Sequence, residues 1–98
     1  MIIVTGSVHA RPETLPDVLA ASLAHVARSR EEPGCLQHGV HQSVEDPTLV
    51  VFFERWTDHD ALAAHFEQPG SLEFVRAVAG LARDRPTLEI FDASPAER

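Results

Sequence analysis

The sequence predicts an α+β fold of the ferredoxin-like type, a split β-α-β arrangement with a four-stranded antiparallel sheet and helices on one face. Apolar runs rich in β-branched and aromatic residues alternate with segments of helical periodicity. Their expected order is strand, helix, strand, strand, broken helix, strand. The 98 residues, 44% hydrophobic and 23% charged, suit one small globular domain. We place this domain at residues 1–93 and expect a frayed tail over 94–98.

The first strand and the first helix are expected within residues 1–30. Residues 1–9 (MIIVTGSVH) read as a strand. Thr14 and Asp17 have the spacing of a capping box and predict a helix start, with the helix ending near Arg30, before Pro33-Gly34. This reading places His25 at the surface. The apolar face is expected to contain Leu15, Val18, Leu19, Ser22, Leu23, Val26 and Ala27.

The next two strands are expected to form an antiparallel hairpin. Residues 35–43 (CLQHGVHQS) predict a strand weakened by Gly39, with Leu36 and His38 on the same face. Residues 48–56 (TLVVFFERW) predict the central strand, which is apolar on both faces. Because helices cover only one face of such a sheet, we expect a second copy of the chain to cover the other. The predicted assembly is a homodimer joined through its sheet faces.

The last third of the chain predicts a broken helix and a final strand. Thr57 and Asp60 again have capping-box spacing, and Pro69-Gly70 should divide the helix in two. Residues 87–92 (TLEIFD) read as the last strand. The second helical piece is expected to bury Leu72, Val75, Val78, Ala79 and Ala82, with Phe74 beside them.

Composition and charge exclude several classes of partner. The net charge of −7, with eight Lys and Arg, supplies no basic patch for nucleic acid and disfavours anionic membranes. Cys35 is the single cysteine, so no intramolecular disulfide forms. The sequence carries no leader-like start and no apolar run long enough to span a bilayer, so we expect a cytoplasmic protein.

Several side chains are candidates for chemistry. His65 lies on the predicted helix and carries an imidazole, the side chain best suited to act as a general base at neutral pH. Trp56 offers a flat aromatic wall and one N–H donor. Glu54 shares the face of Trp56 and, on an otherwise apolar face, needs a polar partner. His38 is a possible pocket-edge residue. It cannot chelate together with His41, because a strand turns them to opposite faces, and we expect no metal site.

Four segments carry a resemblance to a known family: Glu32-Pro33-Gly34-Cys35-Leu36, Asp46-Pro47, residues 53–58 (FERWTD) and residues 61–66 (ALAAHF). They resemble the antibiotic biosynthesis monooxygenase family, and within it the small quinol monooxygenases. The resemblance implies a dimeric α/β barrel with a pocket in each protomer. It also implies oxidation of a phenolic, quinol or polycyclic aromatic substrate by O2, with no cofactor. By position, the resemblance implies that Trp56 and His65 line this pocket. We expect His65 to be catalytic, and the residues expected to bind the substrate are Trp56, Phe52, Phe66, Glu54 and His38.

Two departures keep other functions open. At Phe52 the polyketide-oxidising members carry a polar amide, so the mechanism at this position differs from theirs. A haem-binding or haem-degrading relative is an alternative, although Thr5-Gly6-Ser7 stands where those relatives carry an asparagine. A non-catalytic dimeric module that binds a small apolar ligand is the other alternative.

Overall fold

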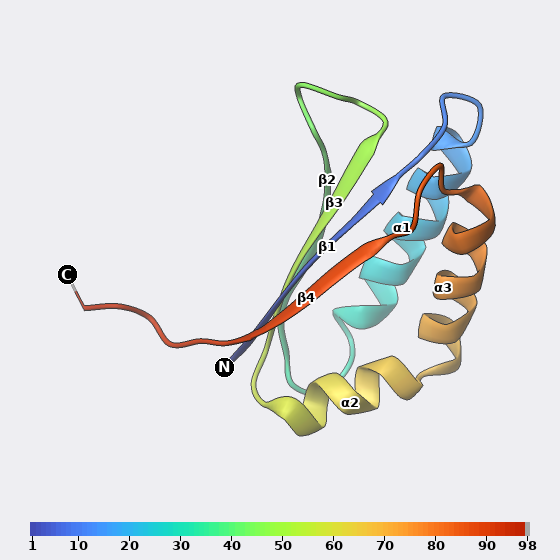
Figure 1. Ribbon diagram of the computed structural model, residues 1–98. Coiled ribbons are helices and arrows are strands. Elements are labelled where there is room, and N and C mark those ends of the chain that lie inside the picture. The colour runs from blue at the N-terminus through green and yellow to red at the C-terminus, as the bar shows by residue number, and fades with distance from the viewer. Residues whose placement is uncertain (98) are drawn as a thin grey trace.

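The computed structural model describes residues 1–97 and confirms the expected element order and the ferredoxin-like fold. One antiparallel sheet with strand order β2-β3-β1-β4 carries the helices on a single face (Figure 1). No helix among residues 1–97 is both long and apolar enough to cross a membrane. The elements are β1 (Ile2–His9), α1 (Leu15–Ser29), β2 (Cys35–Gln42), β3 (Leu49–Trp56), α2 (His59–Glu67), α3 (Pro69–Leu81) and β4 (Thr87–Asp92).

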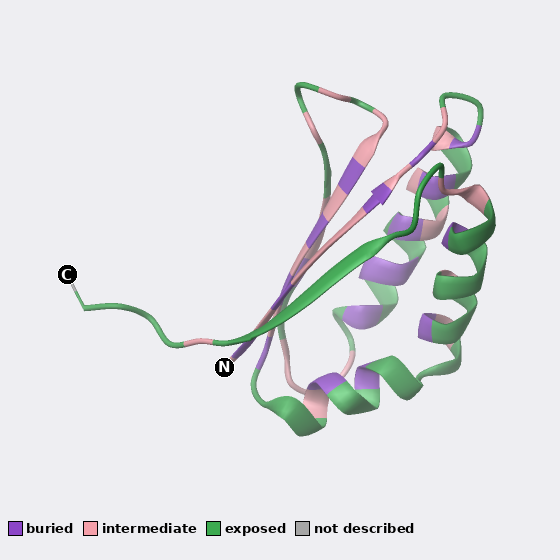
Figure 2. Cartoon of the chain, viewed as in Figure 1, coloured by how far each residue is buried: buried purple, intermediate pink, exposed green. Residues whose placement is uncertain are grey.

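The central strand β3 alternates in burial, as its sequence predicts. Phe52, Glu54 and Trp56 are buried under the helices, and the intervening residues are half-buried on the other face. β4 at the sheet edge is exposed along its whole length (Figure 2). The apolar core forms two clusters, one containing Phe52 and the other Trp56. Glu54 stands between them on β3, so a carboxylate interrupts the core.

Helix α1 has the predicted bounds, and its buried face agrees with the prediction only in part. Val18, Ser22 and Val26 are buried as expected. Leu23 is 61% exposed, whereas His25 is only 5% exposed, so the prediction of a surface His25 is wrong. The reason is that α1 packs against α3, which turns the side carrying small and polar residues inward. The residues buried on α1 are Val18, Ser22, His25, Val26 and Ser29.

Thr14 does not cap α1, contrary to its capping-box spacing. Its hydroxyl donates to the carbonyl of Leu81 (2.8 Å) and thus ties the start of α1 to the end of α3. At α2 the cap is Asp58 rather than Thr57, because the Asp58 carboxylate accepts from the Ala61 amide (2.8 Å). The sequence therefore predicts where both helices start, but not the groups that cap them.

The predicted break between the last two helices is confirmed at Pro69, where α3 begins. The inward face of α3 differs from the prediction: Ser71 and Val78 are buried and Phe74 is half-buried, whereas Leu72 and Val75 are exposed. Positions 71, 74 and 78 follow i, i+3, i+7 spacing, so a single narrow stripe meets the rest of the protein.

A β-bulge shifts the register of β2 between Cys35 and Gln37. The extra residue turns Cys35 toward the cluster that contains Trp56 and pushes Leu36 outward, where it is 48% exposed. The expected face of Leu36 is therefore wrong. After the bulge, His38 lies directly opposite Glu54, on the buried face as predicted.

Candidate functional site

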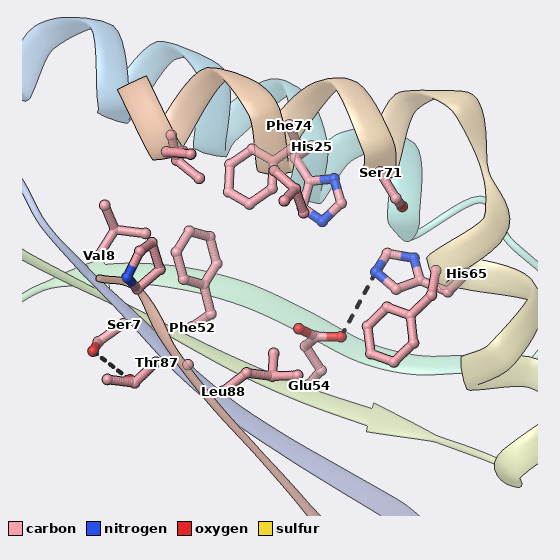
Figure 3. A pocket seen from close by; sticks show the side chains of 16 residues that line it. Ser7, Val8, His25, Phe52, Glu54, His65, Ser71, Phe74, Thr87 and Leu88 are labelled. Carbon is pink, nitrogen blue, oxygen red and sulfur yellow. Dashed lines mark hydrogen bonds and ion pairs between the residues drawn. The ribbon is translucent and has the colours of Figure 1, made fainter. Parts of the chain in front are cut away.

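A cavity of about 280 Å³ lies between the sheet and the two C-terminal helices. Its walls are mostly carbon, contributed by Phe52 from β3, Phe74 and Val78 from α3, and Leu88 from β4 (Figure 3). Phe52 and Phe74 meet edge to face with ring centroids 5.6 Å apart. The shape and lining therefore suit a flat, largely apolar molecule.

The structure brings most of the predicted site residues to this cavity. His65, Phe52, Phe66 and Glu54 line it. Trp56, which we expected on the wall, lies one layer behind it and is fully buried. His38 is likewise behind the wall, beside Glu54. Both Trp56 and His38 contact the carboxylate of Glu54, which does line the cavity.

His65 is held on both sides by carboxylates. It projects from α2, is 3% exposed, and its Nδ1 lies 2.8 Å from Oε1 of Glu32, in the loop between α1 and β2. Because an ionised carboxylate only accepts, this bond places the proton of a neutral ring on Nδ1. Nε2 then carries the lone pair and lies 3.9 Å from Glu54 Oε1. A bound molecule can therefore meet a basic nitrogen.

Glu54 is a buried acid with several polar neighbours. Its Oε1 accepts a hydrogen bond from Trp56 Nε1 (2.9 Å) and lies 3.3 Å from His38 Nε2. Burial alone raises the pKa of Glu54, but the neighbouring His38, the Trp56 N–H and His65 outweigh burial. Together they hold the pKa below its ordinary value, and Glu54 is ionised at neutral pH.

His25 is the functional candidate that the sequence analysis missed. Its ring stacks on Phe74 with centroids 4.2 Å apart and lines the cavity. Burial, followed by the nearby His38, His65 and Arg28, lowers the pKa of His25 to about 3, so the ring is neutral. The signal available in the sequence was the spacing of Ser22, His25 and Ser29, a stripe of polar residues continuous with Val18.

The polar groups gather at one end of the cavity. His25 from α1, His38 from β2 and His65 from α2 each bring a ring nitrogen within 4.8 Å of the others. Glu54 faces His65 from the sheet, and Ser71 lies beside them on α3 (Figure 3). An apolar chamber with bases and a carboxylate at one end can bind a ring and handle a proton on its polar substituent.

Known proteins resemble this chain in sequence over most of its length. Residues 1–77 match the family model described as antibiotic biosynthesis monooxygenase. Deoxynogalonate monooxygenase of Streptomyces nogalater is 32% identical over 76 residues, which is 78% of this chain and 62% of that protein. An uncharacterized protein of Synechocystis is 29% identical over 90 residues, covering 92% of this chain and 61% of its own length. The chain thus spans about three fifths of these two relatives.

Solved structures share the fold over nearly the whole chain. A crystal structure described as an antibiotic biosynthesis monooxygenase has a TM-score of 0.89 at 29% identity, covering 97% of this chain and all of that one. A structure from Deinococcus radiodurans has a TM-score of 0.94 at 22% identity, covers 100% of this chain and 97% of the other, and supports the fold alone. On the family match over residues 1–77, the chain belongs to the antibiotic biosynthesis monooxygenase family.

Proposed function

We propose that the protein is a monooxygenase that oxidises a small phenol or quinol with O2 and needs no organic cofactor. The observation that carries this proposal is the apolar cavity with the lone pair of His65 Nε2 at one end. A volume of about 280 Å³ is at the lower limit of small-molecule pockets. We therefore propose a substrate of one or two rings in preference to the larger polycyclic substrates that the family resemblance allows.

Such a substrate supplies all the electrons of the reaction. Removal of the phenolic proton gives an electron-rich anion, which transfers an electron to O2, and the two radicals combine into a C–O bond. The resulting peroxide anion takes the proton back from His65. The hydroperoxide then loses water together with the hydrogen on the same carbon, which leaves a carbonyl. In balance, one phenol and one O2 give one quinone and one water. No external reductant is required.

The residues take distinct roles in this proposal. His65 Nε2 accepts the phenolic proton, a contribution worth about 10²–10⁴-fold in rate for a positioned general base. Glu54, ionised and 3.9 Å away, stabilises the imidazolium that forms. Phe52 and Phe74 hold the ring. Trp56 is a positioning residue, since its N–H fixes Glu54.

We also propose that two copies pair through the open faces of their sheets. That face carries half-buried Val51 and Phe53 from β3, and Phe91 from the edge strand is 45% exposed. An apolar sheet face of this kind is a typical site of association. Light scattering coupled to size-exclusion chromatography should give twice the 10.7 kDa chain mass, and a monomer at all concentrations would contradict this pairing.

Oxygen uptake with a panel of mono- and bicyclic hydroquinones tests the activity. The wild-type protein should consume O2, and His65→Ala should be slower by at least about 10²-fold, the lower bound for a lost general base. His59→Ala is the matched control, because His59 is an exposed α2 histidine paired with Asp92 and remote from the cavity lining. Ligand binding without O2 uptake would favour a binding module, and a Soret band on adding hemin would favour the haem-binding alternative.

A further inference from the structure

Three buried imidazoles from three different elements converge at the polar end of the cavity. His25 comes from α1, His38 from β2 and His65 from α2, and one ring nitrogen of each lies within 4.8 Å of the other two. We propose that these three histidines bind a divalent transition-metal ion, with Glu54 beside it to balance its charge. Imidazole is a preferred ligand of Zn²⁺, Co²⁺, Ni²⁺ and Cu²⁺, and three histidines with an open fourth position form a common zinc site.

His38 provides the observation that points to a ligand. Its side chain is 0% exposed, and neither ring nitrogen has a hydrogen-bond partner within residues 1–97. Its Nε2 lies 3.3 Å from Glu54 Oε1, an ion-pair distance without hydrogen-bond geometry. A buried polar group without a hydrogen bond destabilises the fold. An ion in the cluster would accept the lone pair of such a nitrogen and remove that cost.

The groups around the rings are those that metal-bound histidines use. Glu32 Oε1 accepts from Nδ1 of His65 at 2.8 Å, which is the carboxylate–histidine arrangement that orients an imidazole toward a metal. The other nitrogen of His65 faces Glu54 Oε1, as does Nε2 of His38. A single carboxylate oxygen therefore already lies against two of the three proposed ligands.

The cluster needs only a small contraction to reach metal geometry. Zinc–nitrogen bonds of about 2.0–2.1 Å in a tetrahedral site place the nitrogens about 3.4 Å apart. The observed spread of up to 4.8 Å must therefore close by at most about 1.4 Å, through side-chain rotation. The Arg28 guanidinium lies 3.4 Å from His25 Nδ1, so a metal bound at that nitrogen would displace this contact, whereas a metal bound at Nε2 would leave it in place. Arg28 retains its 2.9 Å hydrogen bond to the carbonyl of Gly70.

The expectation of no metal site rested on His38 and His41, and that part of the argument holds. His41 is exposed, whereas His38 is buried. The proposed ligands instead come from elements far apart in the sequence, which strand alternation alone could not bring together. The ion would take the lone pair of His65 Nε2, so the metal-bound protein cannot use this nitrogen as a base. The site is therefore inhibitory toward the proposed oxygenase reaction.

Titration of untagged, chelator-treated protein with Co²⁺ tests the proposal without any substrate. We expect one Co²⁺ per chain, visible d–d absorption typical of tetrahedral nitrogen coordination, and a rise in Tm. His38→Ala and His25→Ala should lose the visible spectrum. His41→Ala, on the same strand and exposed, should bind as the wild type does. Glu32→Ala, which removes only the partner of His65, should bind about 10–100-fold more weakly.

The outcomes separate this site from the proposed activity. Absence of Co²⁺ binding by folded wild-type protein, or binding that survives His38→Ala, overturns the metal site and leaves the oxygen-uptake result untouched. If His38→Ala does not fold by circular dichroism, Glu32→Ala decides, and unchanged affinity in that variant overturns the proposal. If the wild type binds Co²⁺ but no quinol is oxidised, the metal site stands and the oxygenase proposal fails.

Discussion

Glu32 Oε1 lies 2.8 Å from His65 Nδ1, although the two residues are 33 positions apart. The loop that carries Glu32 is fixed by Gly34, so the EPGCL segment and the helix with His65 meet at a defined distance. This contact determines the tautomer of the ring and leaves Nε2 facing the cavity. Two segments that are typical of the family are thus parts of a single structural unit.

Removing this contact should slow the reaction without emptying the cavity. We expect Glu32→Ala to lower kcat by about 10–100-fold, because His65 loses part of the advantage of a positioned base. KM should change little, since Glu32 does not line the cavity. Glu32→Gln, whose amide oxygen still accepts from Nδ1, should recover part of the rate. Glu31→Ala, an exposed neighbour, is the control. Equal loss in both alanine variants would contradict the role of Glu32.

Trp56→Phe should destabilise the fold because it removes a hydrogen-bond donor from the buried carboxylate of Glu54. The substitution deletes the N–H that donates to Glu54 Oε1 at 2.9 Å and leaves that acceptor without its hydrogen bond. The expected loss is about 1–3 kcal/mol in the free energy of unfolding. Urea denaturation should be followed by circular dichroism, because the substitution removes the only tryptophan and with it the fluorescence signal. An unchanged midpoint would mean that His38 and His65 satisfy Glu54 without the indole.

Gly34→Ala should be more damaging than a typical glycine substitution. Gly34 has φ +84°, and a Cβ there would lie 2.5 Å from Ala61 Cβ and 2.8 Å from Thr57 Oγ1. The left-handed conformation alone costs roughly 1–2 kcal/mol for a residue with a side chain. Thermal unfolding should show a marked drop in Tm, and a Tm equal to that of the wild type would contradict the left-handed turn at this position.

Gly80→Ala is the matched control for Gly34→Ala. Gly80 lies within α3, and a Cβ there would meet no atom within 4 Å. Because alanine has the higher helix propensity, this substitution should raise the free energy of unfolding by about 0.5–1 kcal/mol. In the same thermal-unfolding assay, Tm should fall in Gly34→Ala and rise in Gly80→Ala.

Cys35 should react slowly with iodoacetamide at neutral pH. Burial, followed by the negative charges of Glu32 and Glu54, raises the pKa of the thiol, so less thiolate is present. The rate should rise as pH passes upward through the raised pKa. Leu36→Cys in a Cys35→Ser background places a thiol on an exposed neighbour and should react faster. Faster reaction at Cys35 would contradict the burial produced by the β-bulge.

The sequence predicted the fold well because its strongest signals are periodic. The alternation in β3 and the Pro69 break each identify an element without reference to the rest of the chain. The buried sides of α1 and α3 were predicted only in part, because each helix has more apolar positions than it can bury. Val18, Val26 and Val78 are buried as expected. Which side turns inward is decided by contact between the two helices, as the exposure of Leu23 and the burial of His25 show.

The candidate site was predictable in part for the same reason. His65 and Phe52 were found because the chemistry of one residue and the pattern of one strand indicate them. The cluster of His25, His38 and His65 was missed, because it depends on the packing of three elements that no local spacing relates. The β-bulge near Cys35 likewise has no local signal and displaced the expected face of Leu36.

The central claim is that this cavity carries out oxygenation of a small hydroxylated aromatic. The most direct test is a reaction of the wild-type protein with a bicyclic hydroquinone under ¹⁸O₂, with the product analysed by mass spectrometry. The account predicts one labelled oxygen atom in the quinone product and the other in water. Product formed without label, or at the same rate in His65→Ala, would contradict it.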